Sequence, residues 1–135
     1  LRFGGGGADH MAYIIPGGPS PYINCSSPGG PDDLIDTHNR DDLGKQPWHC
    51  LNVTWLDNFL ELASYSGAEL IFGLDINPRN AVSGAWDPAP ARALIKYATS
   101  RGYKFAGFEL GNEQNNAFSA KAEAADFLIL QVRCY

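Results

Sequence analysis

ELIFGL at residues 69–74 and KFAGFEL at residues 104–110 decide the fold. The first is a short continuous apolar run, as expected for a strand buried in a parallel sheet, and the second follows as another strand. Between them, DPAPARALIKYATSRG at 87–102 predicts a helix with Asp87 as its N-cap and Gly102 at its end. This order of elements predicts a βαβ unit with a right-handed crossover.

The same alternation continues outward along the chain of 135 residues. Apolar residues at helical spacing predict an amphipathic helix over 54–66, with Thr54 as its N-cap and Gly67 as its stop. Residues 1–5 predict a strand, and 119–132 predict a further helix. By length the chain forms one domain of α/β class, residues 1–135.

A long loop insertion, about 17–50, interrupts this pattern and is rich in Gly, Pro, Ser, Asp and Asn. It exceeds the ~15 residues usual for structureless connections, which favours a functional or family-specific insertion. Cys25 and Cys50 bracket the loop, and we expect them to form a disulfide, with Cys134 left for a partner beyond this chain. Three reduced thiols in a cytosolic protein remain the alternative.

Two glycosylation sequons lie beside these cysteines, at Asn24 and Asn52. Together with the cysteines they favour an oxidising, secretory setting. We therefore expect a glycoprotein that is secreted, extracellular or lysosomal/vacuolar, with membrane association left open.

Composition excludes several other classes of protein. A hydrophobic fraction of 44% with 19% charged residues is typical of a soluble globular chain, and a net charge of −5 gives no sign of nucleic-acid binding. No apolar run approaches the ~18 residues of a transmembrane segment. The glycine run at 3–10 lacks the third glycine of a dinucleotide fingerprint, so no cofactor is expected. The three histidines share no metal-like spacing, so no metal site is expected.

The segment FELGNE at 108–113 contains the candidate catalytic residue. Ligands of parallel α/β folds bind beyond the carboxyl ends of strands, and Glu113 follows such an end after a turn at Gly111. Glu113 could protonate a glycosidic oxygen and then activate water, while Asn112 could hold a sugar hydroxyl. The alternative is a solvated loop carboxylate.

Four segments carry a family resemblance. They are LRFGG (1–5), LIFGLD (70–75), WDPAPARALIKYATSRGY (86–103) and FELGNE (108–113). In this order they resemble glycoside hydrolase family 79, the family of heparanase and its plant and microbial β-glucuronidase relatives, and the cysteine-bearing insertion looks more like the plant-type members. The resemblance implies a (β/α)8 TIM barrel. A full barrel takes ~250 residues, so this chain, which begins without Met as a fragment would, would form about its first, N-terminal half, with the remainder of the barrel missing.

The resemblance also implies roles for particular residues. Glu113 falls on the acid/base of a retaining enzyme and Asn112 on the asparagine beside it. The family's nucleophile is a second glutamate on a later strand, which is missing from this chain. Asp9 matches an aspartate of the family, although a loop aspartate is an equal alternative, and Asp75 stands where the family often has Asn. We include Asp9 and Asp75 with Asn112 among the candidate substrate-binding residues.

Three further residues are assigned from strand alternation and loop position. Glu109 should point to one face of its strand, and if that face lines a barrel it needs a cation, which Arg2 can supply as structural support. The rival role for Arg2 is to support the missing nucleophile. Trp86, on a loop after a strand, is the best tryptophan for stacking on a sugar.

We expect a retaining glycoside hydrolase that cuts β-linked glucuronic acid in polysaccharides or proteoglycans and is inactive as this fragment. One alternative is another retaining β-glycosidase on the same barrel. A second, of a different class, is a truncated, non-catalytic carbohydrate-binding product.

Overall fold

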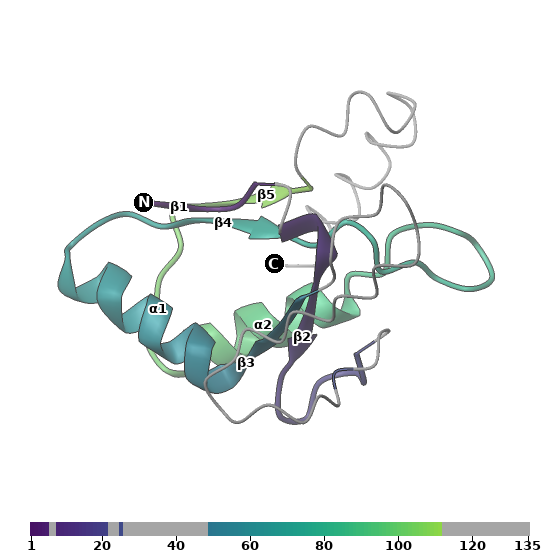
Figure 1. Cartoon of the computed structure of the whole chain (residues 1–135), viewed down its shortest axis with the longest axis horizontal. Coiled ribbons are helices and arrows are strands. Elements are labelled where there is room, and N and C mark those ends of the chain that lie inside the picture. The colour runs from purple at the N-terminus through teal and green to yellow at the C-terminus, as the bar shows by residue number, and fades with distance from the viewer. Residues whose placement is uncertain (6–7, 22–24, 26–48, 112–135) are drawn as a thin grey trace.

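The computed structural model describes residues 1–5, 8–21, 25 and 49–111. In this part of the chain, strands β1 (Arg2–Phe3), β4 (Ile71–Leu74) and β5 (Gly107–Leu110) form a parallel sheet in the order β1-β4-β5 (Figure 1). Strands β2 (Met11–Ile14) and β3 (His49–Asn52) form a separate parallel pair. The helices are η1 (Ala8–His10, a 3-10 turn), α1 (Val53–Tyr65) and α2 (Ala89–Ser100).

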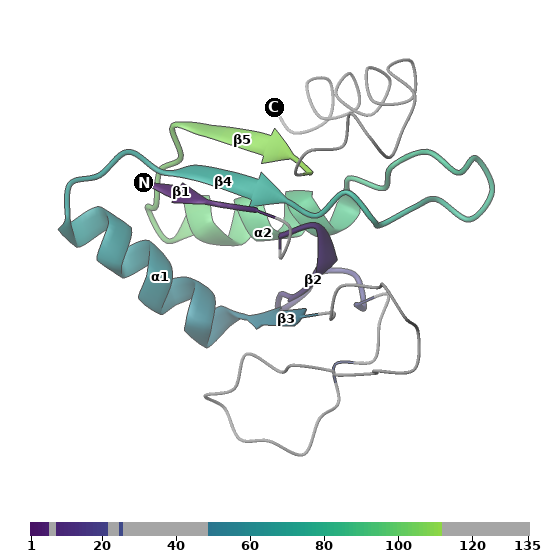
Figure 2. The same ribbon diagram turned by 45° about the horizontal axis from the view of Figure 1, so that its top comes forward.

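The two α-helices lead into strands of the three-stranded sheet, and α2 connects neighbouring parallel strands. Helix α1 precedes β4 and helix α2 joins β4 to β5, and both lie on the same side of the sheet (Figure 1). Figure 2 shows the three strands side by side and pointing the same way. This mixed α/β arrangement, with parallel strands and crossover helices, is compatible with part of a (β/α)8 barrel.

The core lies between this sheet and the two helices. Phe72 and Leu74 of β4 alternate onto the helix side and are fully buried. They meet leucines of both helices, Leu60 and Leu94 among them, in one hydrophobic cluster. Each fully buried side chain of this size contributes about 1.5–3 kcal/mol through removal from water. Burial of these apolar faces therefore fixes the position of the strands whose carboxyl ends carry the candidate site.

Strands β2 and β3 were not expected from the sequence. Residues Met11–Ile14 pair in register with His49–Asn52. Residues 49 and 50 therefore belong to a strand, and the insertion expected over about 17–50 ends before His49. Each strand has four residues, which is too short to show a clear period of two, so their pairing depends on contacts distant in sequence. The helix expected over 119–132 lies outside the described residues.

The start of α1 corrects the expected N-cap. Asn52, not Thr54, is the N-cap, and its Oδ1 accepts a hydrogen bond from the Trp55 N–H at 2.9 Å. Asn52 has the extended backbone that an N-cap requires, because it is also the last residue of β3. The expected stop is confirmed, since Gly67 follows the helix with φ +65°.

Helix α2 begins slightly later than expected. Its N-cap is Pro88 rather than Asp87, because Pro88 already has right-handed helical dihedrals. Asp87 Oδ1 still accepts the Ala89 N–H at 3.0 Å, so its carboxylate supports the first turn. Gly102, with φ +87°, ends the helix as predicted. The strand expected over 104–110 is formed from Gly107 to Leu110.

The expected disulfide is confirmed. Cys25 and Cys50 are bonded, with their Cα atoms 5.9 Å apart and 25 residues between them in sequence. The bond ties the insertion to β3, and in the loop-entropy model it restricts the unfolded chain by about 3 kcal/mol. Among the described helices, neither is long and apolar enough to cross a membrane.

Candidate functional site

The candidate site lies at the carboxyl edge of the parallel sheet. Strands β4 and β5 end side by side, with Leu74 paired to Leu110. Gly111 then turns the chain with φ +71°, and its N–H donates to the Leu74 carbonyl at 3.0 Å. Asn112 and Glu113 follow directly in sequence but lie outside the described residues, so their placement stays a prediction.

Asp75, the residue after β4, is the centre of a buried polar network. Its N–H donates to the Tyr13 hydroxyl at 2.8 Å, and its carbonyl accepts the Trp86 indole N–H at 2.9 Å. Its Oδ1 accepts the backbone N–H of Asn77 at 2.8 Å. The side chain is buried at 1% exposure, so these contacts hold the β4 loop on a core that excludes water.

The same network reaches Asp9 on η1. The Asn77 side-chain amide donates to the Asp9 carbonyl, which joins the turn after β1 to the loop after β4. Asp9 itself is buried at 6% exposure. The two predicted aspartates therefore belong to one connected set of buried residues at the carboxyl edge of the sheet.

Tyr13 carries the network into β2. Burial raises the pKa of its hydroxyl well above the ordinary value, and the charge of Asp75 raises it further. The hydroxyl therefore keeps its proton at neutral pH while it accepts from the Asp75 N–H. Sequence reasoning missed Tyr13 and Asn77, because neither stands in a recognisable motif and their partners are distant in the chain.

Asp75 and Trp86 differ from open sugar-binding residues. Trp86 is buried at 2% exposure and belongs to the hydrophobic core cluster. The polar contacts described for Asp75 and Trp86 are made within the chain. Direct contact with a sugar would need atoms that this structure covers. What the structure assigns to both residues is the anchoring of the β4 loop.

Arg2 and Glu109 form the ion pair expected from strand alternation. Arg2 Nε lies 2.7 Å from Glu109 Oε2, on the face of the sheet opposite the helices. A Cβ at Gly4 would meet Glu109 Oε2 at 3.3 Å and the Arg2 guanidinium carbon at 3.4 Å, so the glycine there leaves room for the pair. Gly73 of β4 is the register partner of Glu109. A Cβ at Gly73 would also meet the Gly4 Cα at 3.0 Å, so a larger residue would push β1 and β4 apart.

The two described histidines lie near each other across β2 and β3. Burial lowers the pKa of His10, and the nearby charge of His49 lowers it further. Among the residues that the structure describes, no group of three or more His, Cys, Asp or Glu side chains could hold a metal ion.

Of the two predicted glycosylation sites, Asn52 is half-buried and caps α1, and Asn24 lies outside the described residues.

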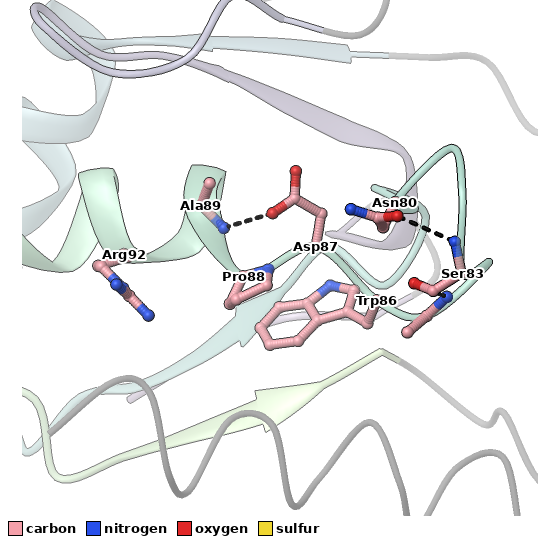
Figure 3. A pocket seen from close by; sticks show the side chains of 8 residues that line it. Asn80, Ser83, Trp86, Asp87, Pro88, Ala89 and Arg92 are labelled. Carbon is pink, nitrogen blue, oxygen red and sulfur yellow. Dashed lines mark hydrogen bonds between the residues drawn. The ribbon is translucent and has the colours of Figure 1, made fainter.

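The loop after β4 forms a hairpin beside a pocket of about 380 Å³. Arg79 and Trp86 make an antiparallel bridge across this hairpin. The pocket lies between the hairpin tip and the first turn of α2 (Figure 3). Its lining includes Asn80, Ser83, Trp86, Asp87, Pro88 and Arg92. Apart from Trp86, the sequence analysis singled out none of these residues for binding.

Comparison with known proteins identifies relatives for most of the chain. The profile described as Glycosyl hydrolase family 79, N-terminal domain, matches residues 35–130. A mouse (Mus musculus) protein named inactive heparanase-2 is 38% identical over 76 residues, which are 56% of this chain and 12% of that relative. The human (Homo sapiens) protein of the same name is 41% identical over 66 residues, 49% of this chain and 11% of the relative. The chain thus spans a small part of these curated relatives.

Proposed function

The chain belongs to glycosyl hydrolase family 79, and we propose that the protein containing it is a retaining glycoside hydrolase acting on β-linked glucuronic acid in polysaccharides or proteoglycans. One observation carries this proposal. The described chain ends at the carboxyl edge of a parallel sheet, where Gly111 turns directly before Asn112 and Glu113. That edge is where barrel enzymes hold their catalytic residues.

Glu113 is the proposed acid/base. In the first step it protonates the leaving glycosidic oxygen, and in the second it removes a proton from water. A retaining enzyme also needs a carboxylate nucleophile about 5 Å away, on the other side of the scissile bond. We assign that role to a glutamate on a later strand of the complete barrel. Asn112 is proposed to bind a sugar hydroxyl beside the acid.

Glu109 is the nearest rival for Glu113, and its ion pair argues against it. Its Oε2 accepts a hydrogen bond from the Arg2 Nε at 2.7 Å, so this oxygen is already engaged within the sheet and not presented to a glycosidic oxygen. We therefore assign Arg2 and Glu109 to structural support of the sheet face that would line the barrel. The same site is supported by Asp9, Asp75 and Trp86, which hold in place the loops that follow β1 and β4.

A secretory location fits this activity. The Cys25–Cys50 disulfide supports folding in an oxidising compartment. We propose that the protein is extracellular or lysosomal/vacuolar, and that Asn24 and Asn52 carry N-glycans. At Asn52 a glycan on Nδ2 would leave Oδ1 free to keep capping α1.

The names of the relatives favour a second candidate. Both are called inactive heparanase-2, so a carbohydrate-binding protein without hydrolase activity is the alternative. Equal binding of the polysaccharide by wild type and Glu113→Gln, with no turnover of an aryl β-glucuronide by either, would favour this second candidate.

The deciding experiment compares Glu113→Ala with Glu109→Ala in the complete protein. Glu113→Ala should lose most activity on the natural polysaccharide and less on an activated aryl β-glucuronide, whose leaving group needs no proton. Azide should then restore turnover and give a β-configured glycosyl azide, because it attacks without base assistance. Glu109→Ala should show no azide rescue. If azide restored turnover to Glu109→Ala and left Glu113→Ala inactive, the roles of the two glutamates would be reversed.

A further inference from the structure

The pocket beside the β4 hairpin has the size and lining of a saccharide site. Its volume of about 380 Å³ falls within the range of roughly 300–1,000 Å³ typical of small-ligand sites. Ala85, Pro88 and Ala89 supply apolar surface beside the buried Trp86, while Asn80, Ser83 and Arg92 supply polar groups from both sides (Figure 3). Apolar surface with a few placed polar groups is what the face and hydroxyls of a sugar ring require.

The hairpin holds these polar groups in place before any ligand binds. The Asn80 Oδ1 accepts the N–H groups of Val82 and Ser83 at 3.0 and 2.9 Å. The Asn80 N–H donates to the Ala85 carbonyl at 2.8 Å. Because its oxygen is occupied, the exposed Asn80 amide presents its NH2 group outward. The Ser83 Oγ accepts the Ala85 N–H at 3.3 Å and keeps its own hydrogen to donate.

The charges around the pocket favour an anionic ligand. Arg92, on the first turn of α2, is exposed and forms no ion pair with any residue in the described part of the chain. Asp87 is the one carboxylate among the lining residues. Its Oδ1 accepts the Ala89 N–H, and the carboxylate is turned away from the Trp86 ring (Figure 3). The guanidinium of Arg92 is therefore the charge presented to a ligand, and its geometry suits a carboxylate.

We propose that this pocket binds a hexuronate unit of an acidic polysaccharide, with Arg92 on the carboxylate and Asn80 and Ser83 on hydroxyls. The inference rests on the proposed function, because it extends the same substrate along the carboxyl edge of the sheet. It places the contact on the loop that follows β4, whereas Glu113 follows β5 in the sequence. The site therefore sets affinity for the polymer rather than the chemistry of the cut.

The test is a binding titration of the ¹⁵N-labelled complete protein, followed at the Trp86 indole N–H by NMR. Three tetrasaccharides serve as probes: one with unsulfated glucuronate, the same one with its carboxylates reduced to alcohols, and the reduced one carrying sulfate esters. Wild type should bind the glucuronate form tightest. Arg92→Gln should weaken that binding about tenfold, the lower end expected for a charge-assisted hydrogen bond, and should not change binding of the neutral form.

The matched control is Lys96→Gln, which removes a cation from the next turn of the same helix, outside the pocket lining. It should change the affinity less than twofold. Equal losses in Arg92→Gln and Lys96→Gln, or equal binding of the neutral and glucuronate forms, would overturn the proposal. Tighter binding of the sulfated than of the glucuronate form would overturn the hexuronate assignment. The titration involves no turnover, so a failure of the catalytic assignment of Glu113 does not change how this result is interpreted.

Discussion

Two tyrosine hydroxyls in this chain contact an aspartate in different surroundings, one through the backbone N–H and one through the carboxylate. At the carboxyl edge of the sheet, Tyr13 is buried at 4% exposure and its hydroxyl accepts the Asp75 N–H at 2.8 Å. Between α1 and α2, the half-buried Tyr97 donates its hydroxyl to Asp57 Oδ2 at 2.9 Å. Asp57 also pairs with Arg101, whose side chain is 48% exposed. The distances are nearly equal, but the first contact is buried and the second only partly so, which lets water compete for the second alone.

The comparison teaches that burial, not bond length, decides what such a contact contributes. A buried donor left without an acceptor loses its whole solvation, whereas an exposed one binds water instead. The buried contact also lies where the β4 loop leaves the sheet, so a loss there should disturb the candidate site. The part-buried contact joins α1 to α2 and includes no residue of the candidate site. Four measurements can break or sharpen this contrast.

Trp86→Ala should produce the largest loss. Removing the buried ring leaves a cavity and takes away the donor to the Asp75 carbonyl, so the free energy of unfolding should fall by about 3–5 kcal/mol. Urea unfolding followed by circular dichroism measures it. Trp86→Phe, which keeps most of the ring but not the N–H, should lose less. A cost below about 1 kcal/mol for Trp86→Ala would mean that the ring is not part of the core.

Tyr13→Phe should come next. It removes one hydroxyl and leaves the buried Asp75 N–H without its acceptor, so the unfolding free energy should fall by about 1–3 kcal/mol. The same urea titration applies. An unchanged urea midpoint would show that water reaches the Asp75 N–H. Burial would then not distinguish the Tyr13 contact from the Tyr97 contact.

The pH dependence of stability provides the third measurement. The folded-state pKa of Tyr13 is raised by burial and then by the charge of Asp75, while the unfolded value lies near 10. The unfolded chain therefore releases the proton first, and the stability that Tyr13 contributes should be constant below pH ~10 and fall above it by up to about 1.4 kcal/mol per pH unit. Tyr13→Phe should flatten this alkaline loss. An identical alkaline slope in Tyr13→Phe and wild type would contradict the assignment.

Tyr97→Phe should have the smallest effect, about 0.5 kcal/mol or less, because Arg101 and water remain as partners for the Asp57 carboxylate when the hydroxyl is lost. Burial, followed by the hydrogen bond to Asp57, also raises the Tyr97 pKa. The variant should therefore flatten the alkaline loss less than Tyr13→Phe does. A cost equal to that of Tyr13→Phe would show that burial does not separate the two contacts.

Local patterns were enough for much of the architecture. Helical spacing and stop glycines predicted α1 and α2, with Gly67 and Gly102 at their ends. Alternation along β5 predicted that Glu109 needs Arg2, and the two lie 2.7 Å apart. The N-cap of α1 was predicted two residues late, at Thr54, because the capping residue also ends a strand that the sequence did not reveal.

For the candidate site, the motif FELGNE indicated the edge of the sheet and the residues that follow it. The sequence did not indicate Tyr13 or Asn77 as partners of Asp75, nor the pocket at Arg92. Trp86 shows the same limit. A tryptophan on a loop is compatible with an open stacking surface, and only the packing of the hairpin onto the core buries it.

The division follows from the range of the forces involved. Helix periodicity, caps, glycine turns and the order of strands depend on residues a few positions apart, so the sequence alone determined the succession of βαβ units and the location of the motif glutamate. The pairing of β2 with β3, the hydrogen bond from Asp75 to Tyr13 and the burial of Trp86 join distant or loop-separated segments. Only the folded chain brings those segments together, because burial and the satisfaction of buried polar groups are properties of the whole packed core.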